Sequence, residues 1–184
     1  MHIVVQFQGR AWEQFAQAMD KLGSGARFGI LAQALNEGGH ALRQATIAAE
    51  TAQTGLPQDT IDRAQVETPA SGSHLTYTIQ ATGGNVRLKY FNAKEGAGGV
   101  TANPWNRPTF YAGHFITSGW KTRRVVLGGH VYHRVGASRL PIAQSRSGLF
   151  IPEEMTKGKT ASTFNAQSSV VLNTVVSRLG ALLP

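Results

Sequence analysis

Residues 110–152, FYAGHFITSGWKTRRVVLGGHVYHRVGASRLPIAQSRSGLFIP, decide the fold that we expect for this chain. Apolar and polar side chains alternate around residues 115–116, as they do in a half-buried strand. Residues 125–135 have the pattern of two strands joined by a two-residue turn at Gly128-Gly129. Pro141 has no N–H group and cannot continue a central strand. This stretch therefore predicts a sheet, and the segments around it are mainly helical.

Several short motifs in the same stretch follow one another in a recognisable order. They are a glycine before a Phe-Ile pair, an arginine-containing strand followed by glycine, an Arg-Leu-Pro-Ile segment, and a proline before the last helix. The residues concerned are Gly113, Phe115, Ile116, Arg134, Gly136, Arg139, Pro141, Ile142 and Pro152. In order and spacing these motifs resemble the phage minor tail protein Z family. The resemblance is clearest over about residues 110–182.

The resemblance implies a structural role in a tailed bacteriophage. Members of this family complete the top of the tail and join it to the neck of the head. For this chain the resemblance implies a homo-oligomeric, six-membered ring around the DNA channel, made in the host bacterial cytoplasm and carried in the virion. Its partners would be other neck, connector, tail-tube or terminator proteins. A tail terminator or a head-closure ring protein remains an alternative.

Length and composition favour one soluble domain. The chain has 184 residues, 41% of them hydrophobic, and no cysteine, which excludes disulfides and thiolate metal ligands. No secretory leader pattern is expected at the N-terminus. The apolar tail at residues 170–183 is too short to span a bilayer, so no membrane contact is expected.

The net charge of +8 is distributed unevenly. Residues 1–80 have five basic and seven acidic side chains, a net −2, whereas residues 81–184 have thirteen and three, a net +10. A basic half can contact nucleic acid, contact an acidic protein, or simply be solvated. The densest basic patch is expected at Trp120, Lys121, Arg123 and Arg124, extended by Arg87, Lys89, Arg134, Arg139 and Arg146.

Two helices are expected before the sheet. Residues 11–22 have the apolar spacing of an amphipathic helix that ends at residues 23–25. Residues 26–54 have a thin, alanine-rich stripe typical of a long second helix. Gly38 and Gly39 lie within it, where each glycine costs about 1 kcal/mol relative to alanine. We expect a bend or a closely packed neighbour there, at an interface with an adjacent subunit.

Shorter elements are expected at the two ends and in the middle of the chain. Residues 2–8 alternate weakly, which is typical of an edge strand or an extended arm. Residues 57–65 predict a short helix with Pro57 in its first turn. Residues 75–90 predict a hairpin that turns at residues 82–84. Ser162 is expected to cap the C-terminal helix.

Residues 92–109, NAKEGAGGVTANPWNRPT, predict a long flexible loop, because glycine and proline are frequent and no periodicity is evident. Trp105 in this loop either packs on its own sheet or docks onto a neighbouring subunit. We place Trp105 and Arg107 in a candidate subunit or neck interface.

The sequence lacks the motifs of a catalytic or metal site. His130 and His133 are three residues apart, a spacing that puts them on opposite faces of a strand with no acidic partner close by. Nucleophile-elbow, phosphate-loop and dinucleotide-binding patterns are also missing. We therefore expect no enzyme activity and no cofactor.

Two function classes remain. The expected fold is α+β, with an antiparallel sheet of four to five strands packed against long N-terminal helices and a C-terminal helix. The first class is the structural tail-completion protein described above. The alternative is a small nucleic-acid-binding protein that uses its basic half, and it would bind DNA as a free monomer with a steep salt dependence.

Overall fold

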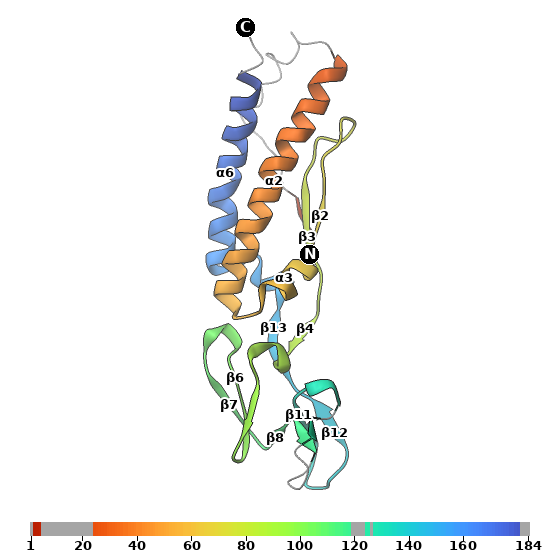
Figure 1. The fold of residues 1–184 in the computed structure, drawn as a ribbon, viewed down its shortest axis with the longest axis vertical. Coiled ribbons are helices and arrows are strands. Elements are labelled where there is room, and N and C mark those ends of the chain that lie inside the picture. Colours follow the sequence, from red (N-terminus) through yellow and green to blue (C-terminus); the bar gives the residue numbers. More distant parts are fainter. Residues whose placement is uncertain (1, 5–23, 119–123, 126, 181–184) are drawn as a thin grey trace.

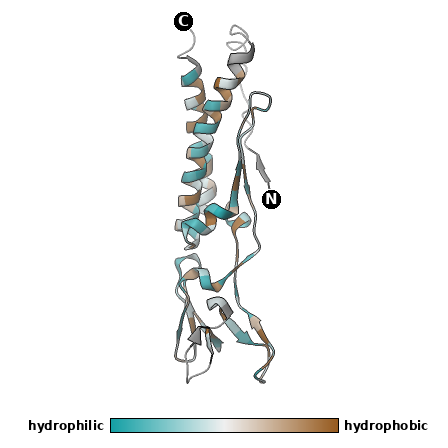
Figure 2. Ribbon diagram, turned by 45° about the vertical axis from the view of Figure 1, so that its right-hand side comes forward, coloured by the Kyte–Doolittle hydropathy of each residue, from teal (hydrophilic) through white to brown (hydrophobic). Residues whose placement is uncertain are grey.

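The computed structural model describes residues 2–4, 24–118, 124–125 and 127–180, and it has an elongated α+β fold (Figure 1). Two long helices lie at one end of the molecule and several small antiparallel sheets extend to the other. Apolar segments recur along its whole length (Figure 2), and most of the buried apolar side chains belong to one cluster, which we call the main core. The expected α+β class is confirmed. The expected helix at residues 11–22 lies outside the described residues.

The two long helices are α2 (Ser24–Thr54) and α6 (Gly158–Gly180), and they pack side by side. Small side chains on α2 let them approach, since Gly38 faces Val171 of α6 and Ala34 lies in a cluster with Val175. Helix α2 confirms the predicted long helix. Helix α6 begins at Gly158, four residues before the predicted cap at Ser162, whose hydroxyl instead donates to the Lys159 carbonyl.

A three-stranded antiparallel sheet lies beside α2. Its strands are β1 (His2–Val4), β3 (Thr78–Ala81) and β2 (Gln65–Thr68), in the order β1-β3-β2. The short helix α3 (Gln58–Ala64) precedes β2 and confirms the predicted short helix, although Pro57 lies just before the helix instead of in its first turn. Strand β1 confirms the predicted edge strand for its three residues. Ile79 of β3 is 1% exposed, so this sheet contributes directly to the main core.

Two short strands form a narrow connection, which we call the waist. Strand β4 (Asn85–Arg87) pairs antiparallel with β13 (Arg146–Phe150), between the helical half and the remaining sheets (Figure 1). The short helix α5 (Ile151–Glu154) follows β13 directly, with Pro152 in its first turn. The 3-10 helix η1 (Leu88–Phe91) follows β4, and its Leu88 and Phe91 side chains are buried in the main core.

Three further sheets lie beyond the waist. The first has the order β5-β6-β7 and comprises β5 (Lys94–Gly96), β6 (Gly99–Ala102) and β7 (Thr109–Ala112). The second has the order β12-β11-β8 and comprises β8 (His114–Phe115), β11 (Tyr132–Arg134) and β12 (Ile142–Gln144). The third pairs β9 (Thr117–Ser118) with β10 (Arg124–Val125). Two 3-10 turns, η2 (Pro104–Asn106) and η3 (Leu127–Gly129), complete the elements.

Strand pairing differs from the predicted pairing. In place of one sheet of four to five strands, the described residues form five sheets of two or three strands. The hairpin predicted at residues 75–90 is wrong: β3 pairs with β2 and β1, and β4 pairs with β13. The hairpin predicted around Gly128-Gly129 is also wrong, because β11 pairs with β12 and β8. The β1–β3 and β4–β13 pairs join strands that are distant in sequence, whereas β11 forms a hairpin with β12, the next strand along the chain.

The long loop predicted at residues 92–109 is wrong as well. Strands β5 and β6 form a hairpin there, and Val100 is fully buried. Gly98 has a φ of +79°, which the tight turn requires. Gly99 packs against the Tyr111 carbonyl and the Phe110 ring, leaving no room for a side chain. The glycines therefore serve the hairpin and its close packing.

Candidate functional site

The residues of the family resemblance come together mainly in the sheet of β8, β11 and β12, which we call the distal sheet. Phe115 pairs with Tyr132, and Arg134 pairs with Ile142. The Arg134 guanidinium lies 5.9 Å from the centroid of the Phe115 ring, a cation–π distance. Motifs from three separate chain segments thus form one surface at the end of the molecule opposite the helix pair (Figure 1).

The other resemblance residues, except Pro152, lie next to the strands of the distal sheet along the chain. Gly113 has a φ of +70° and leads the chain into β8. Ile116 packs against the main core from just beyond β8. Pro141 precedes β12, and its carbonyl accepts a hydrogen bond from the Val135 N–H. Pro152 lies apart, at the start of α5.

The loop between β11 and β12 is exposed throughout, and we call this loop together with Arg134, the last residue of β11, the distal tip (residues 134–141). Val135 is 61% exposed and Leu140 is 68% exposed. Gly136 and Arg139 also belong to the tip. The distal tip therefore presents two apolar side chains and two guanidinium groups to whatever lies beyond the molecule.

The predicted basic patch is described only in part. Trp120, Lys121 and Arg123 lie outside the described residues, and Arg124 is placed in β10 without a described side chain. Arg134 and Arg139 belong to the distal tip. The patch extension at Arg87, Lys89 and Arg146 instead gathers at the waist, so the cations beyond residue 80 occupy at least two separate surfaces.

Gly38 and Gly39 are buried within the chain, which corrects their placement in a subunit interface. A β-carbon on Gly38 would lie 2.7 Å from Cγ1 of Val171, and one on Gly39 would overlap the Tyr77 ring. The expected close neighbour is therefore present, but it belongs to the same chain. Both glycines are needed because α6 and the β1-β3-β2 sheet pack tightly against α2.

Trp105 and Arg107 lie in and after η2, where the chain returns to the end of α2. Trp105 is 36% exposed and has a φ of +53°, a left-handed conformation that is uncommon for a large side chain. Neighbouring Asn106 donates from Nδ2 to the Ala52 carbonyl at 2.8 Å, which fixes this turn on α2. Arg107 is exposed.

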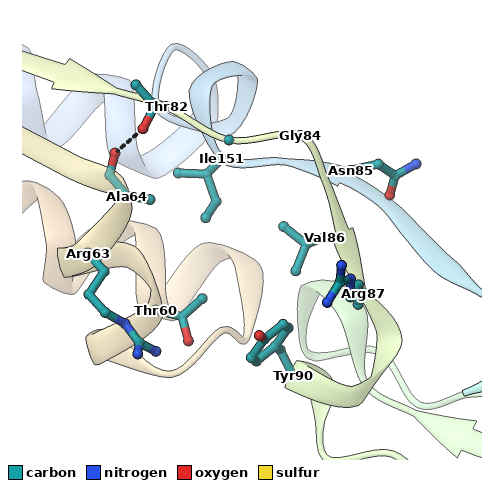
Figure 3. Close-up of a pocket in the computed structure, with 11 residues that line it drawn as sticks. Thr60, Arg63, Ala64, Thr82, Gly84, Asn85, Val86, Arg87, Tyr90 and Ile151 are labelled. Atoms are coloured by element: carbon teal, nitrogen blue, oxygen red, sulfur yellow. Dashed lines mark hydrogen bonds between the residues drawn. The ribbon is translucent and has the colours of Figure 1, made fainter. Parts of the chain in front are cut away.

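A groove at the waist was not predicted from the sequence (Figure 3). Its volume is about 360 Å³, and Ala64, Val86 and Ile151 supply apolar walls. Arg63 of α3 and Arg87 of β4 lie on opposite sides, with Thr60 and Tyr90 between them. These residues come from separate segments of the chain, and for this reason the groove could not be predicted. Of its residues, only Arg87 had been singled out in the sequence, as part of the predicted extension of the basic patch.

The histidines contact different neighbours. His133 of β11 lies beside His114, with ring centroids 5.1 Å apart, and its Nδ1 is 2.9 Å from the Ser145 hydroxyl. His130 lies before the strand, where its Nε2 is 3.2 Å from Lys89 Nζ. In the part of the chain that the structure describes, no three His, Asp or Glu side chains are grouped as metal ligands would be.

A scan against models of protein families, a search of curated proteins and a search of solved structures found no match. Among the described helices, none has the length and apolar character needed to cross a membrane.

Proposed function

We propose that this chain is a structural subunit of a tailed-phage virion that completes the top of the tail and joins it to the neck. The observation that carries the proposal is the convergence of the resemblance residues on the distal sheet and its exposed tip. A set of motifs that serves one interface is expected to form one surface, and these motifs come from segments up to about 30 residues apart.

Exposed apolar side chains support a role in assembly. Val135 and Leu140 at the distal tip expose more than half of their surface. Phe28, Val170 and Val176 are exposed on the helix pair, at the other end of the molecule. Exposed apolar side chains that lie close together mark surfaces that contact a partner. Val135 and Leu140 lie close together, because the Val135 N–H donates to the carbonyl of Pro141, so the distal tip offers a contact surface of this kind.

The proposed assembly is a homo-oligomeric ring of six subunits around the DNA channel. In this arrangement the distal tip contacts the next layer of the neck or the tail, and neighbouring subunits cover other apolar side chains. Arg134 and Arg139 at the tip suit an acidic patch on the partner, while Val135 and Leu140 supply the apolar contact. The role needs no reaction step and no cofactor.

A deletion and complementation experiment tests the role. We expect the phage that carries this gene to produce unattached heads and tails when the gene is deleted, visible by electron microscopy. A plasmid copy of the wild-type chain should restore joined particles, and mass spectrometry should detect the protein in them. The double variant Val135→Ser and Leu140→Ser should not restore joining, because it removes the apolar contact of the tip.

Val66→Ser is the matched control, because Val66 is also 56% exposed but lies on β2, away from the tip. This control should restore joined particles fully. Normal particles after deletion, or absence of the protein from purified virions, would overturn the proposal. Tight, salt-sensitive DNA binding by the monomer, together with normal joining, would instead favour the alternative of a nucleic-acid-binding protein.

A further inference from the structure

The groove at the waist combines a defined cavity with an excess of positive charge. Figure 3 shows Arg63 and Arg87 on its two sides, and Thr60, Thr82 and Tyr90 add hydroxyl groups to its wall. Among the described residues that line it, none is acidic. Guanidinium and hydroxyl groups are the donors that proteins use most often to hold phosphate oxygens.

Another cation, Arg146, lies on the neighbouring strand opposite Arg87. Arg87 and Arg146 are cross-strand partners in the β4–β13 pair, so their side chains leave the same face of the ribbon. Arg146 donates from Nη1 to the Asn85 carbonyl at 3.0 Å, which holds it beside β4. Like charges directly opposite on neighbouring strands are destabilising. An anion bound between them would relieve this repulsion.

The neighbouring His130 does not add to the charge. Lys89 Nζ lies 3.2 Å from its Nε2, and Arg87 Nη1 lies 3.5 Å from the same atom. Both cations can only donate, so Nε2 accepts and the ring is neutral. Among the ion pairs that the described residues form, none involves Arg63, Arg87, Lys89 or Arg146. The positive charge of the waist is therefore left for an external partner.

We propose that the waist groove binds the phosphate backbone of nucleic acid, with Arg63 and Arg87 as contacts that line the groove and Arg146, the cross-strand partner of Arg87, as a contact beside it. An acidic protein partner fits the groove less well. Protein interfaces depend on buried apolar anchors, and the large exposed apolar side chains of the described chain, such as Phe110 and Leu140, do not line the groove. Backbone contact of this kind carries no base sequence preference.

In the proposed ring, the waist groove of each subunit would be a surface for the DNA that passes through the ring. This placement rests on the proposed function. A single subunit with three contacts is expected to bind weakly, within the range of about 10⁻⁴ to 10⁻⁶ M that is typical of non-specific binding. A ring would combine several such contacts. The isolated chain can nevertheless be tested alone, because low salt strengthens the interaction.

Fluorescence anisotropy with a labelled DNA duplex of random sequence provides the test, over a series of salt concentrations. The triple variant Arg63→Gln, Arg87→Gln and Arg146→Gln is compared with wild type. Because each phosphate contact contributes about 0.9 to the slope of log K against log salt, the variant should lower the slope by about 3. Its affinity at the lowest salt should fall by tenfold or more. Circular dichroism checks that the variant is folded, as expected for three exposed side chains.

The control variant removes the same charge elsewhere, through Lys94→Gln, Lys157→Gln and Lys159→Gln, all at exposed positions away from the groove. It should keep most of the affinity. The proposal is overturned if wild type does not bind DNA at low salt, or if the control loses as much affinity as the groove variant. It is also overturned if poly-glutamate binds the groove at least as tightly as DNA, since the partner would then be an acidic protein. The head–tail joining assay tests the proposed function separately, because deletion of the gene does not depend on what the groove binds.

Discussion

The ring of Tyr77, just before β3, lies directly against the backbone of Gly39 in α2. Tyr77 is 7% exposed, and its hydroxyl donates to the Glu67 carboxylate on β2. The aromatic ring therefore occupies the space that a side chain at position 39 would need. This contact joins the long helix to the β1-β3-β2 sheet, and it requires glycine.

Substitution of Gly39 by leucine is predicted to destabilise the fold. Leucine would force Tyr77 away from α2, and overpacking of this kind costs about 1–3 kcal/mol or more. The melting temperature, measured by circular dichroism, should fall by several degrees. Gly29→Ala is the control in the same helix, since no atom lies within 4 Å of a β-carbon there. Alanine at position 29 should raise stability by up to about 1 kcal/mol. An unchanged melting temperature for Gly39→Leu would show that Tyr77 does not occupy this space.

Glu50 is predicted to make the protein less stable as the pH rises. It is fully buried, and it accepts a hydrogen bond from Nε2 of Gln65 at 2.7 Å. Burial raises the pKa of Glu50 from 4.5 to about 7, the hydrogen bond from Gln65 lowers it, and the nearby Glu154 raises it further. In the unfolded chain this carboxyl ionises near pH 4.5, so between pH 4.5 and 7 the folded state holds more protons. Stability contributed by Glu50 therefore falls across this range and is lowest above pH 7.

The variant Glu50→Gln isolates this contribution. A pKa shift of this size lowers the free energy of unfolding of the wild type by about 3 kcal/mol between pH 4.5 and pH 8. The variant should not show this decrease. Urea denaturation at pH 5, 6, 7 and 8 measures the free energy of unfolding of both proteins. As the pH rises, the free energy of unfolding of the variant should increase relative to that of the wild type. Glu153→Gln, at an exposed position, should follow wild type at each pH. Parallel curves for Glu50→Gln and wild type would mean that Glu50 ionises normally in the folded protein.

Glu95 is predicted to hold two sheets together. Its Oε2 accepts hydrogen bonds of 2.9 Å from Ile116 N and of 2.8 and 2.9 Å from the N–H and hydroxyl of Thr117. The carboxylate of β5 thus fixes the chain between β8 and β9. Glu95→Ala should cost about 1 kcal/mol, because it removes three hydrogen bonds to a charged group at an exposed site, where water can partly replace the carboxylate. Faster hydrogen exchange at the Ile116 and Thr117 amides, without a change in α2, would support this role. Unchanged exchange at both amides would exclude it.

Trp105 remains a predicted contact residue for a neighbouring subunit. Its left-handed backbone favours glycine by about 1–2 kcal/mol, so Trp105→Gly relieves strain while it removes a partly exposed ring. The free energy of unfolding should change by less than about 1 kcal/mol, whereas head–tail joining should fall. Trp105→Phe keeps an aromatic surface and should retain joining. A loss of more than about 3 kcal/mol for Trp105→Gly would place the side chain in the core of its own subunit.

The helices could be predicted from the sequence because their signals are local. The alanine-rich stripe of α2 and the proline before α3 act within one or two turns of helix. Strand pairing could not be predicted in the same way. Strand β4 pairs with β13, about 60 residues later, and each strand alone has only three to five residues of pattern. A short strand accepts any partner that completes its hydrogen bonds, so the tertiary fold makes the choice.

The candidate surfaces show the same division. Arg134 and Arg139 were predicted only as an extension of the basic patch at residues 120–124, and their place at an exposed tip was not predicted. Arg63 and Arg87 lie on the two sides of the waist groove although they are 24 positions apart in the sequence, and no spacing rule predicts this arrangement. Gly38 and Gly39 were recognised as a point of close approach, but the sequence could not say whether the neighbour belonged to the same chain.

The elongated shape of the subunit has one more consequence, which concerns orientation. Helix α2 has 31 residues and extends about 46 Å, and the distal tip lies beyond its far end (Figure 1). One extremity of the subunit is a pair of helix ends, and the other is a hairpin with arginine and leucine side chains. Subunits placed side by side around an axis would therefore form a layer whose upper and lower faces differ chemically. Such a layer distinguishes up from down, and it can be inserted between two different neighbours in only one sense.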